Sequence, residues 1–115
     1  MYSVTEEFVK WLGTLGFAAS TYPPKNGTEF VTVERTGGDV VDLVDRPSIA
    51  VQTWAATEPR AEEIANAIRN AALTSTKPDG VYSIAINAGP YPFWDDSTRL
   101  PRYQIAFDVV CQLVD

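Results

Sequence analysis

The chain of 115 residues is 45% hydrophobic and 21% charged, which are ordinary proportions for one globular domain. Its single cysteine excludes a disulfide framework, and no apolar run approaches the roughly 18 residues of a membrane-spanning helix. A net charge of −6 without clustered basic residues argues against a nucleic-acid-binding domain, and the absence of histidine removes the commonest general base and metal ligand.

The first predicted element is a helix over residues 3–15. Ser3 and Glu6 form a capping box, and Gly16 stands where a left-handed C-terminal cap is favoured. One helical stripe collects the apolar residues Val4, Phe8, Trp11, Leu12 and Leu15. Acids also occupy the first seven residues, where a signal peptide carries a basic segment, so we expect the protein to be made and folded in a cytoplasm.

Three strands are expected next, over residues 17–22, 29–36 and 49–55. In the second strand, alternation separates Val31, Val33 and Arg35 from Phe30, Thr32 and Glu34. In the third strand, alternation separates Ile49, Val51 and Thr53 from Ala50, Gln52 and Trp54, and we expect both faces to be covered. Between these strands, Gly37-Gly38-Asp39 predicts a strand end followed by a polar loop that runs to residue 48.

A second helix is predicted over residues 58–74, with Thr57 as its N-cap and Pro59 in its first turn. Its apolar stripe consists of Ala61, Ile64, Ala65, Ile68 and Ala72. After the turn at residues 77–80 comes a strand in which Tyr82, Ile84 and Ile86 share a face.

The last strand has the clearest alternation in the chain. Its core-facing residues are expected to be Tyr103, Ile105, Phe107, Val109, Cys111 and Leu113. The predicted order is α-β-β-β-α-β-β. Short turns between neighbouring strands favour a mainly antiparallel sheet of four or five strands with both helices packed on it, which is an α+β fold in a single domain over residues 1–115.

No candidate site in the sequence favours catalysis. Cys111 lies inside the alternation of the last strand and is expected to be a small core residue. Asp39, Asp42 and Asp45 could together bind Ca²⁺, but their spacing is not that of an EF-hand, and a solvated acidic loop is the favoured interpretation. The pair at residues 95–96 is read as a turn. We therefore expect no enzyme activity, cofactor or metal ion.

Two predicted loops, residues 36–48 and 89–102, are long for a domain of this size. The second loop combines aromatic and arginine residues of the kind that anchor protein–protein interfaces. These candidate anchors are Tyr91, Phe93, Trp94, Arg99 and Arg102. The alternative is that the aromatic residues fold back over a small core.

Several short runs resemble the tail terminator proteins of long-tailed, non-contractile phages. They are Val33-Glu34-Arg35-Thr36-Gly37-Gly38, Asp45-Arg46-Pro47-Ser48-Ile49-Ala50-Val51-Gln52-Thr53-Trp54-Ala55, the helix from Ala61 to Arg69, Gly89-Pro90-Tyr91, and Pro101-Arg102-Tyr103-Gln104. The resemblance covers residues 4–114 and depends on the order and length of elements rather than on a catalytic signature.

The resemblance implies an α+β subunit that forms a six-membered ring on the end of a completed tail tube. Such a ring stops polymerisation of the major tail tube protein and offers a docking surface for the head–tail connector. DNA would pass through its lumen without specific binding, and the protein would lie at the head-proximal end of the virion tail, with no cofactor and no membrane contact. An acidic chain is consistent with such a conduit, because a basic lumen would hold the DNA.

A ring subunit needs two different interface patches. The strand that is covered on both faces, with Trp54, and the long loops could supply them. The motif residues that we single out as interface candidates are Arg35, Asp45, Arg46 and Arg102. Alternatively, Arg46 or Arg102 pairs with Asp42, Asp45 or Asp96 inside one subunit.

Three functional classes follow from the sequence. The first is the tail terminator, and the second is a neck or head-completion protein of the same virion. The third is an unrelated α+β binding module or small enzyme. Attachment to tail tubes rather than to filled heads distinguishes the first class from the second.

Overall fold

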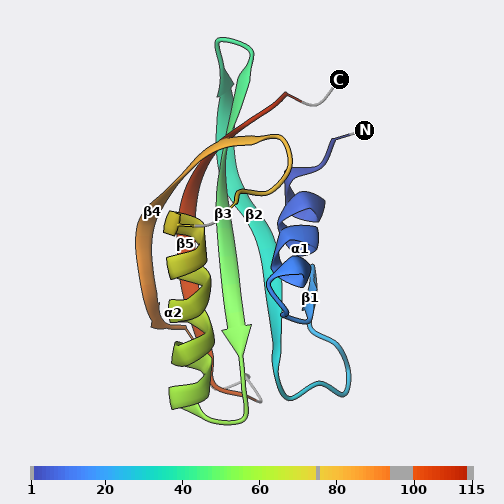
Figure 1. Ribbon diagram of the computed structural model, residues 1–115, viewed down its shortest axis with the longest axis vertical. Coiled ribbons are helices and arrows are strands. Elements are labelled where there is room, and N and C mark those ends of the chain that lie inside the picture. The colour runs from blue at the N-terminus through green and yellow to red at the C-terminus, as the bar shows by residue number, and fades with distance from the viewer. Residues whose placement is uncertain (1, 75, 94–99, 114–115) are drawn as a thin grey trace.

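The computed structural model describes residues 2–74, 76–93 and 100–113. Its elements follow the predicted order α-β-β-β-α-β-β, so the α+β prediction is confirmed (Figure 1). They are α1 Val4–Thr14, β1 Ala19–Ser20, β2 Phe30–Val41, β3 Val44–Trp54, α2 Glu58–Thr74, β4 Val81–Pro92 and β5 Arg102–Cys111. No helix in the described ranges is long and apolar enough to cross a membrane.

The five strands form one sheet in the order β1-β2-β3-β5-β4. The sheet is mixed, because β1 runs parallel to β2, whereas the other three pairs are antiparallel. The strands of a parallel pair need a connection that returns the chain to the same end of the sheet. Residues 21–29 make this connection between β1 and β2. The expected mainly antiparallel sheet is therefore present, with one short parallel edge.

Both helices lie on one face of this sheet, as Figure 1 shows, with α1 against β1 and β2 and α2 against β3, β4 and β5. The predicted caps form at both helix starts. The Ser3 hydroxyl accepts from the backbone N–H of Glu6 at 3.3 Å, and the Thr57 hydroxyl accepts from that of Arg60 at 3.4 Å. Past the end of α1, Gly16 adopts the left-handed conformation that its position predicts, with a φ of +96°.

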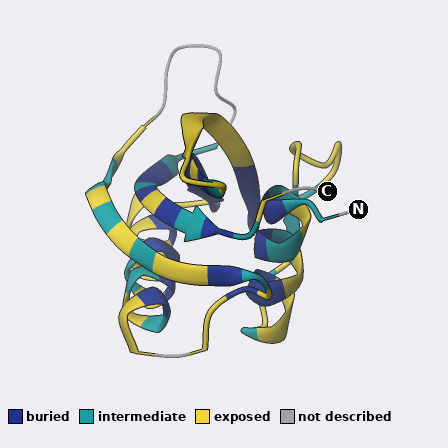
Figure 2. Ribbon diagram, turned by 90° about the horizontal axis from the view of Figure 1, so that it is seen from above, coloured by how far each residue is buried: buried dark blue, intermediate teal, exposed yellow. Residues whose placement is uncertain are grey.

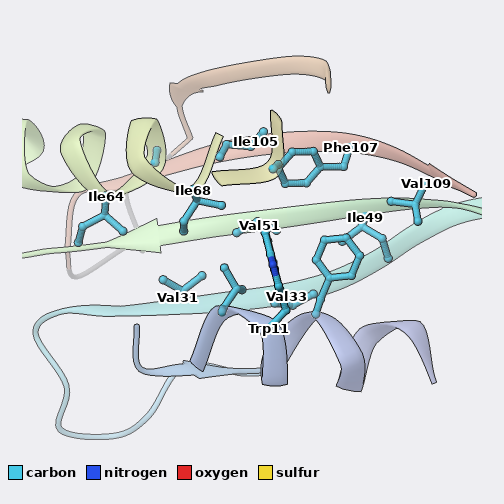
Figure 3. Close-up of a cluster of buried hydrophobic side chains, with 14 of the residues drawn as sticks. Trp11, Val31, Val33, Ile49, Val51, Ile64, Ile68, Ile105, Phe107 and Val109 are labelled. Carbon is cyan, nitrogen blue, oxygen red and sulfur yellow. The ribbon is translucent and has the colours of Figure 1, made fainter. Parts of the chain in front are cut away.

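The hydrophobic core fills the space between the helices and the sheet (Figure 3). It contains the whole predicted stripe of α2 and the predicted core face of β5 up to Cys111. Figure 2 shows these buried stretches on the helices and the strands that meet them. One prediction is wrong, because Leu113 lies beyond the end of β5 and is 38% exposed.

A second correction concerns residues 36–48, which form no loop. Strands β2 and β3 continue as a hairpin, here called the arm (residues 37–47), which turns at Asp42 and Leu43 and projects at the top of Figure 1. Gly38 has a φ of +107°, and a Cβ there would fall on the carbonyl oxygen of Arg46. The glycine pair therefore lets the two strands approach at a bulge and does not end the strand.

The predicted loop over residues 89–102 is also shorter than expected. Strand β4 continues to Pro92, and the Phe93 N–H then donates to the Arg102 carbonyl at 2.8 Å.

At the other end of β4, a register shift between Val81 and Ser83 leaves Tyr82 62% exposed, whereas Ile84 and Ile86 pack against the core. The predicted common face of these three residues is therefore wrong for Tyr82.

Candidate functional site

The sheet face opposite the helices, here called the outer face, carries two rows of interacting side chains. Each row runs across the strands, because its members are cross-strand neighbours in the sheet register. The aromatic row consists of Phe30, Trp54, Arg102 and Phe93, and the polar row of Thr32, Gln52, Gln104 and Tyr91.

In the aromatic row, Arg102 lies between two aromatic rings. Its guanidinium carbon is 4.5 Å from the centre of the Trp54 ring and 4.9 Å from that of Phe93. The other side of Trp54 stacks on Phe30 with the ring centres 5.3 Å apart. Arg102 also donates from Nε to the Phe93 carbonyl at 2.5 Å, which fixes the guanidinium in place. The row thus holds a cation on two π faces.

The polar row is a continuous chain of hydrogen bonds. The Thr32 hydroxyl donates to Gln52 Oε1 at 2.7 Å, the Gln52 amide donates to Gln104 Oε1 at 2.7 Å, and the Gln104 amide donates to the Tyr91 hydroxyl at 2.6 Å. Trp54 joins the two rows by donating from Nε1 to the Thr32 hydroxyl at 3.0 Å.

These contacts explain how buried polar side chains are tolerated on a sheet face that neither described helix covers. Thr32, Gln52 and Gln104 are each less than 10% exposed, and in the described part of the chain every buried side-chain nitrogen or oxygen has a hydrogen-bond partner. A satisfied polar network is rigid, because moving one member leaves another unpaired. The outer face is therefore a rigid surface.

A groove of about 450 Å³ opens beside the two rows, along the edge of β2 beyond its short pairing with β1. Among the side chains that line this outer groove are Tyr22, Glu34, Arg35, Trp54, Phe93 and Arg102. Aromatic walls with charges of both signs suit a protein segment that carries apolar and charged residues.

Arg35 and Asp45, which the sequence analysis singled out, meet at the base of the arm. Both terminal nitrogens of Arg35 donate to the Asp45 carboxylate, at 2.7 and 2.8 Å. The Asp45 side chain is 6% exposed, and the hydrogen bonds from Arg35 hold the pKa of its carboxyl below the usual value. Asp45 is therefore a buried ion-pair partner, and the interpretation of Asp39, Asp42 and Asp45 as a solvated acidic loop is wrong for Asp45.

Cys111 lies beside this ion pair, with its sulfur 4.0 Å from a carboxylate oxygen of Asp45. The cysteine is fully buried, as its place in the alternation predicts. Burial, and then the charge of Asp45, raise the pKa of its thiol, so the reactive thiolate form is disfavoured.

The remaining predicted site residues are divided between the arm and the outer face. Trp54, Tyr91, Phe93 and Arg102 meet on the outer face, so neither Tyr91 nor Phe93 folds back over the hydrophobic core; Tyr91 is bonded to Gln104, and Phe93 is 41% exposed. Arg46 lies exposed on the arm, paired in register with Asp39. Trp94, Arg99 and Asp96 lie outside the described residues.

The alternative is that Arg46 or Arg102 pairs with Asp42 or Asp45. Neither pairing is found among the described residues, and Asp45 pairs instead with Arg35. Sequence reasoning also missed the role of Thr32, Gln52 and Gln104. Alternation separates all three from the core-facing residues of their strands, but only the strand register reveals that they adjoin one another.

Within the described residues there is no group of three acidic or cysteine side chains that could hold a metal ion. A scan against protein-family models found no match to this chain, and a search of curated proteins found none either.

Proposed function

We propose that this protein is a structural subunit that assembles as a ring on the end of a phage or prophage tail tube. In this proposal the ring ends polymerisation of the tube protein and provides the joining surface for the head connector. The observation that carries the proposal is the presence of two different, rigid candidate contact surfaces on one small fold, the arm and the outer face.

Rings require such asymmetry. A contact that uses two different patches repeats from subunit to subunit until it closes, whereas a patch that binds its own copy stops at a dimer. The arm is fixed to the body by the ion pair of Arg35 with the buried Asp45, and the outer face is fixed by its hydrogen-bonded row. Both surfaces can therefore meet a partner with little loss of conformational entropy.

The residues that carry the resemblance to tail terminators support the proposal by their position. The first two motif runs cover residues 33–38 of β2 and 45–54 of β3, which include the base of the arm and its anchor, Arg35 and Asp45. The late motifs contribute Tyr91, Arg102 and Gln104 to the outer face. The net charge of −6 suits a conduit that must not hold DNA.

Electron microscopy of tail tubes mixed with the purified full-length chain tests this proposal. We expect a ring at the growing end of each tube and no further growth when more tube protein is added, without nucleotide or metal. Filled heads serve as the competing target. Rings on heads and bare tubes would favour the neck or head-completion class, and no ring on either would contradict both.

A further inference from the structure

The tip of the arm exposes three large apolar side chains. Val40 is 53% exposed, Val41 is 39% exposed and Leu43 is 80% exposed. Val40 and Val41 are consecutive residues of β2 and point to opposite faces of the hairpin, and Leu43 lies in its turn, so the projecting tip exposes apolar side chains on both faces and at its end. Three large apolar side chains exposed together at one projecting tip are typical of a segment that inserts into another molecule.

The backbone of the turn supports the same conclusion. Asp42 and Leu43 both have positive φ values, 53° and 63°, as in the two-residue turns that favour Asn-Gly or Asp-Gly. Leucine is disfavoured in this left-handed conformation, in which glycine is unstrained. Because the Leu43 side chain is mostly exposed, packing within its own subunit does not offset this backbone strain. The strain therefore points to a contact made outside the subunit.

We propose that the arm tip of one copy docks in the outer groove of the neighbouring copy, a contact that depends on the ring of the proposed function. The groove offers aromatic surface from Tyr22, Trp54 and Phe93 to the apolar tip. Arg35 is already neutralised by Asp45, so the groove's Arg102 complements the acids Asp39 and Asp42 of the arm, and its Glu34 complements Arg46.

Another groove of the same subunit fits the tip less well. It is lined by Arg60 and Glu29, but Arg60 is already bound to both Glu29 and Glu63, so the local charge is negative and repels the acidic tip. Since the arm and the outer groove are different surfaces, their contact is head-to-tail and can close a ring.

The substitution Leu43→Gly separates docking from folding. It creates Asp-Gly, the favoured sequence for this turn, so we expect an unchanged or higher melting temperature together with at least a tenfold loss of ringed tube ends. The matched control is Leu73→Ser on α2. It removes another leucine that is 62% exposed, and it should leave ring formation intact. Normal ring formation by Leu43→Gly would overturn the docking contact.

Cross-linking tests the contact directly. The only native cysteine is buried, so a variant with Leu43→Cys and Glu34→Cys reports on the introduced pair. Glu34 and Val41 are seven positions apart on β2, roughly 20 Å along the strand, whereas a disulfide needs Cα atoms within about 7 Å. Any disulfide between the two positions therefore joins different copies.

On tail tubes, we expect oxidation of this variant to give a ladder of covalent oligomers up to the ring. The control pair Leu43→Cys with Leu73→Cys should stay monomeric. Equal ladders from both pairs, or none from Leu43→Cys with Glu34→Cys while rings are visible, would overturn the docking contact and leave the terminator proposal standing. Absence of rings with the wild-type chain would instead contradict the proposed function itself.

Discussion

At the scale of single residues, the ion pair of Arg35 and Asp45 joins the arm to the core. The carboxylate is buried and the guanidinium is 37% exposed, so the pair connects a core position to the surface. Without Arg35, the carboxylate would be a buried charge with no cation beside it, which is far more costly than the loss of an exposed pair.

We expect Arg35→Met to lower the free energy of unfolding by about 1–3 kcal/mol at pH 7, a value reduced from that of a fully buried pair by the exposure of Arg35. In the wild type, Arg35 lowers the pKa of Asp45 below 3.8, so the pair stabilises the fold above that pH and loses its effect as the pH falls through the lowered pKa. In the variant, burial raises the pKa of Asp45, and acid then neutralises the unpaired charge.

The difference between wild type and variant should therefore shrink between pH 7 and pH 3 in urea denaturation. Arg60→Met is the matched control, because Arg60 makes its ion pairs with Glu29 and Glu63 on the exposed surface, and we expect little change from it at either pH. A constant destabilisation of Arg35→Met across this range would show that its packing, and not its charge, holds the arm.

At the scale of elements, the outer face depends on a row that crosses four strands. Gln104 is the central link, since it accepts from Gln52 and donates to Tyr91. Replacing it by an apolar residue of similar volume removes the 2.7 Å acceptor of the buried Gln52 amide and leaves that amide only its long 3.5 Å contact with Glu34 Oε1.

We expect Gln104→Leu to destabilise the protein by about 1–3 kcal/mol in chemical denaturation. The control is Asn87→Leu, which removes an exposed hydrogen bond between Asn87 on β4 and Asp108 on β5. It should change the free energy of unfolding by less than about 0.5 kcal/mol. Equal effects at the two positions would mean that the row contributes no more than an ordinary surface contact.

The same elements show how far the sequence predicts this structure. Helix bounds, caps and the core face of β5 follow from local patterns, because capping and periodicity need no knowledge of distant partners. The arm does not follow, because glycines that permit a bulge and glycines that end a strand look alike until the opposite strand is known. For the same reason, alternation places Gln52 on the outer face but does not reveal Gln104 as its partner.

At the scale of the whole molecule, the fold places its candidate contacts in different directions. The helices cover one face of the sheet, the two rows stabilise the other, and the arm extends along the long axis of a molecule 42 Å in length (Figure 1). A subunit with this distribution can contact a neighbour and still leave surface for a tube and a connector, as the terminator proposal requires.

Tail length in a deletion strain tests that proposal most directly. The end of a tube polymer resembles every earlier ring, so growth stops only when another molecule covers the last binding surface. Without this protein, we expect filled heads that lack tails and free tails of excessive, variable length by electron microscopy. Adding the wild-type chain during tail assembly should restore capped tails of the correct length. Normal-length tails joined to heads in the deletion strain would contradict the proposal.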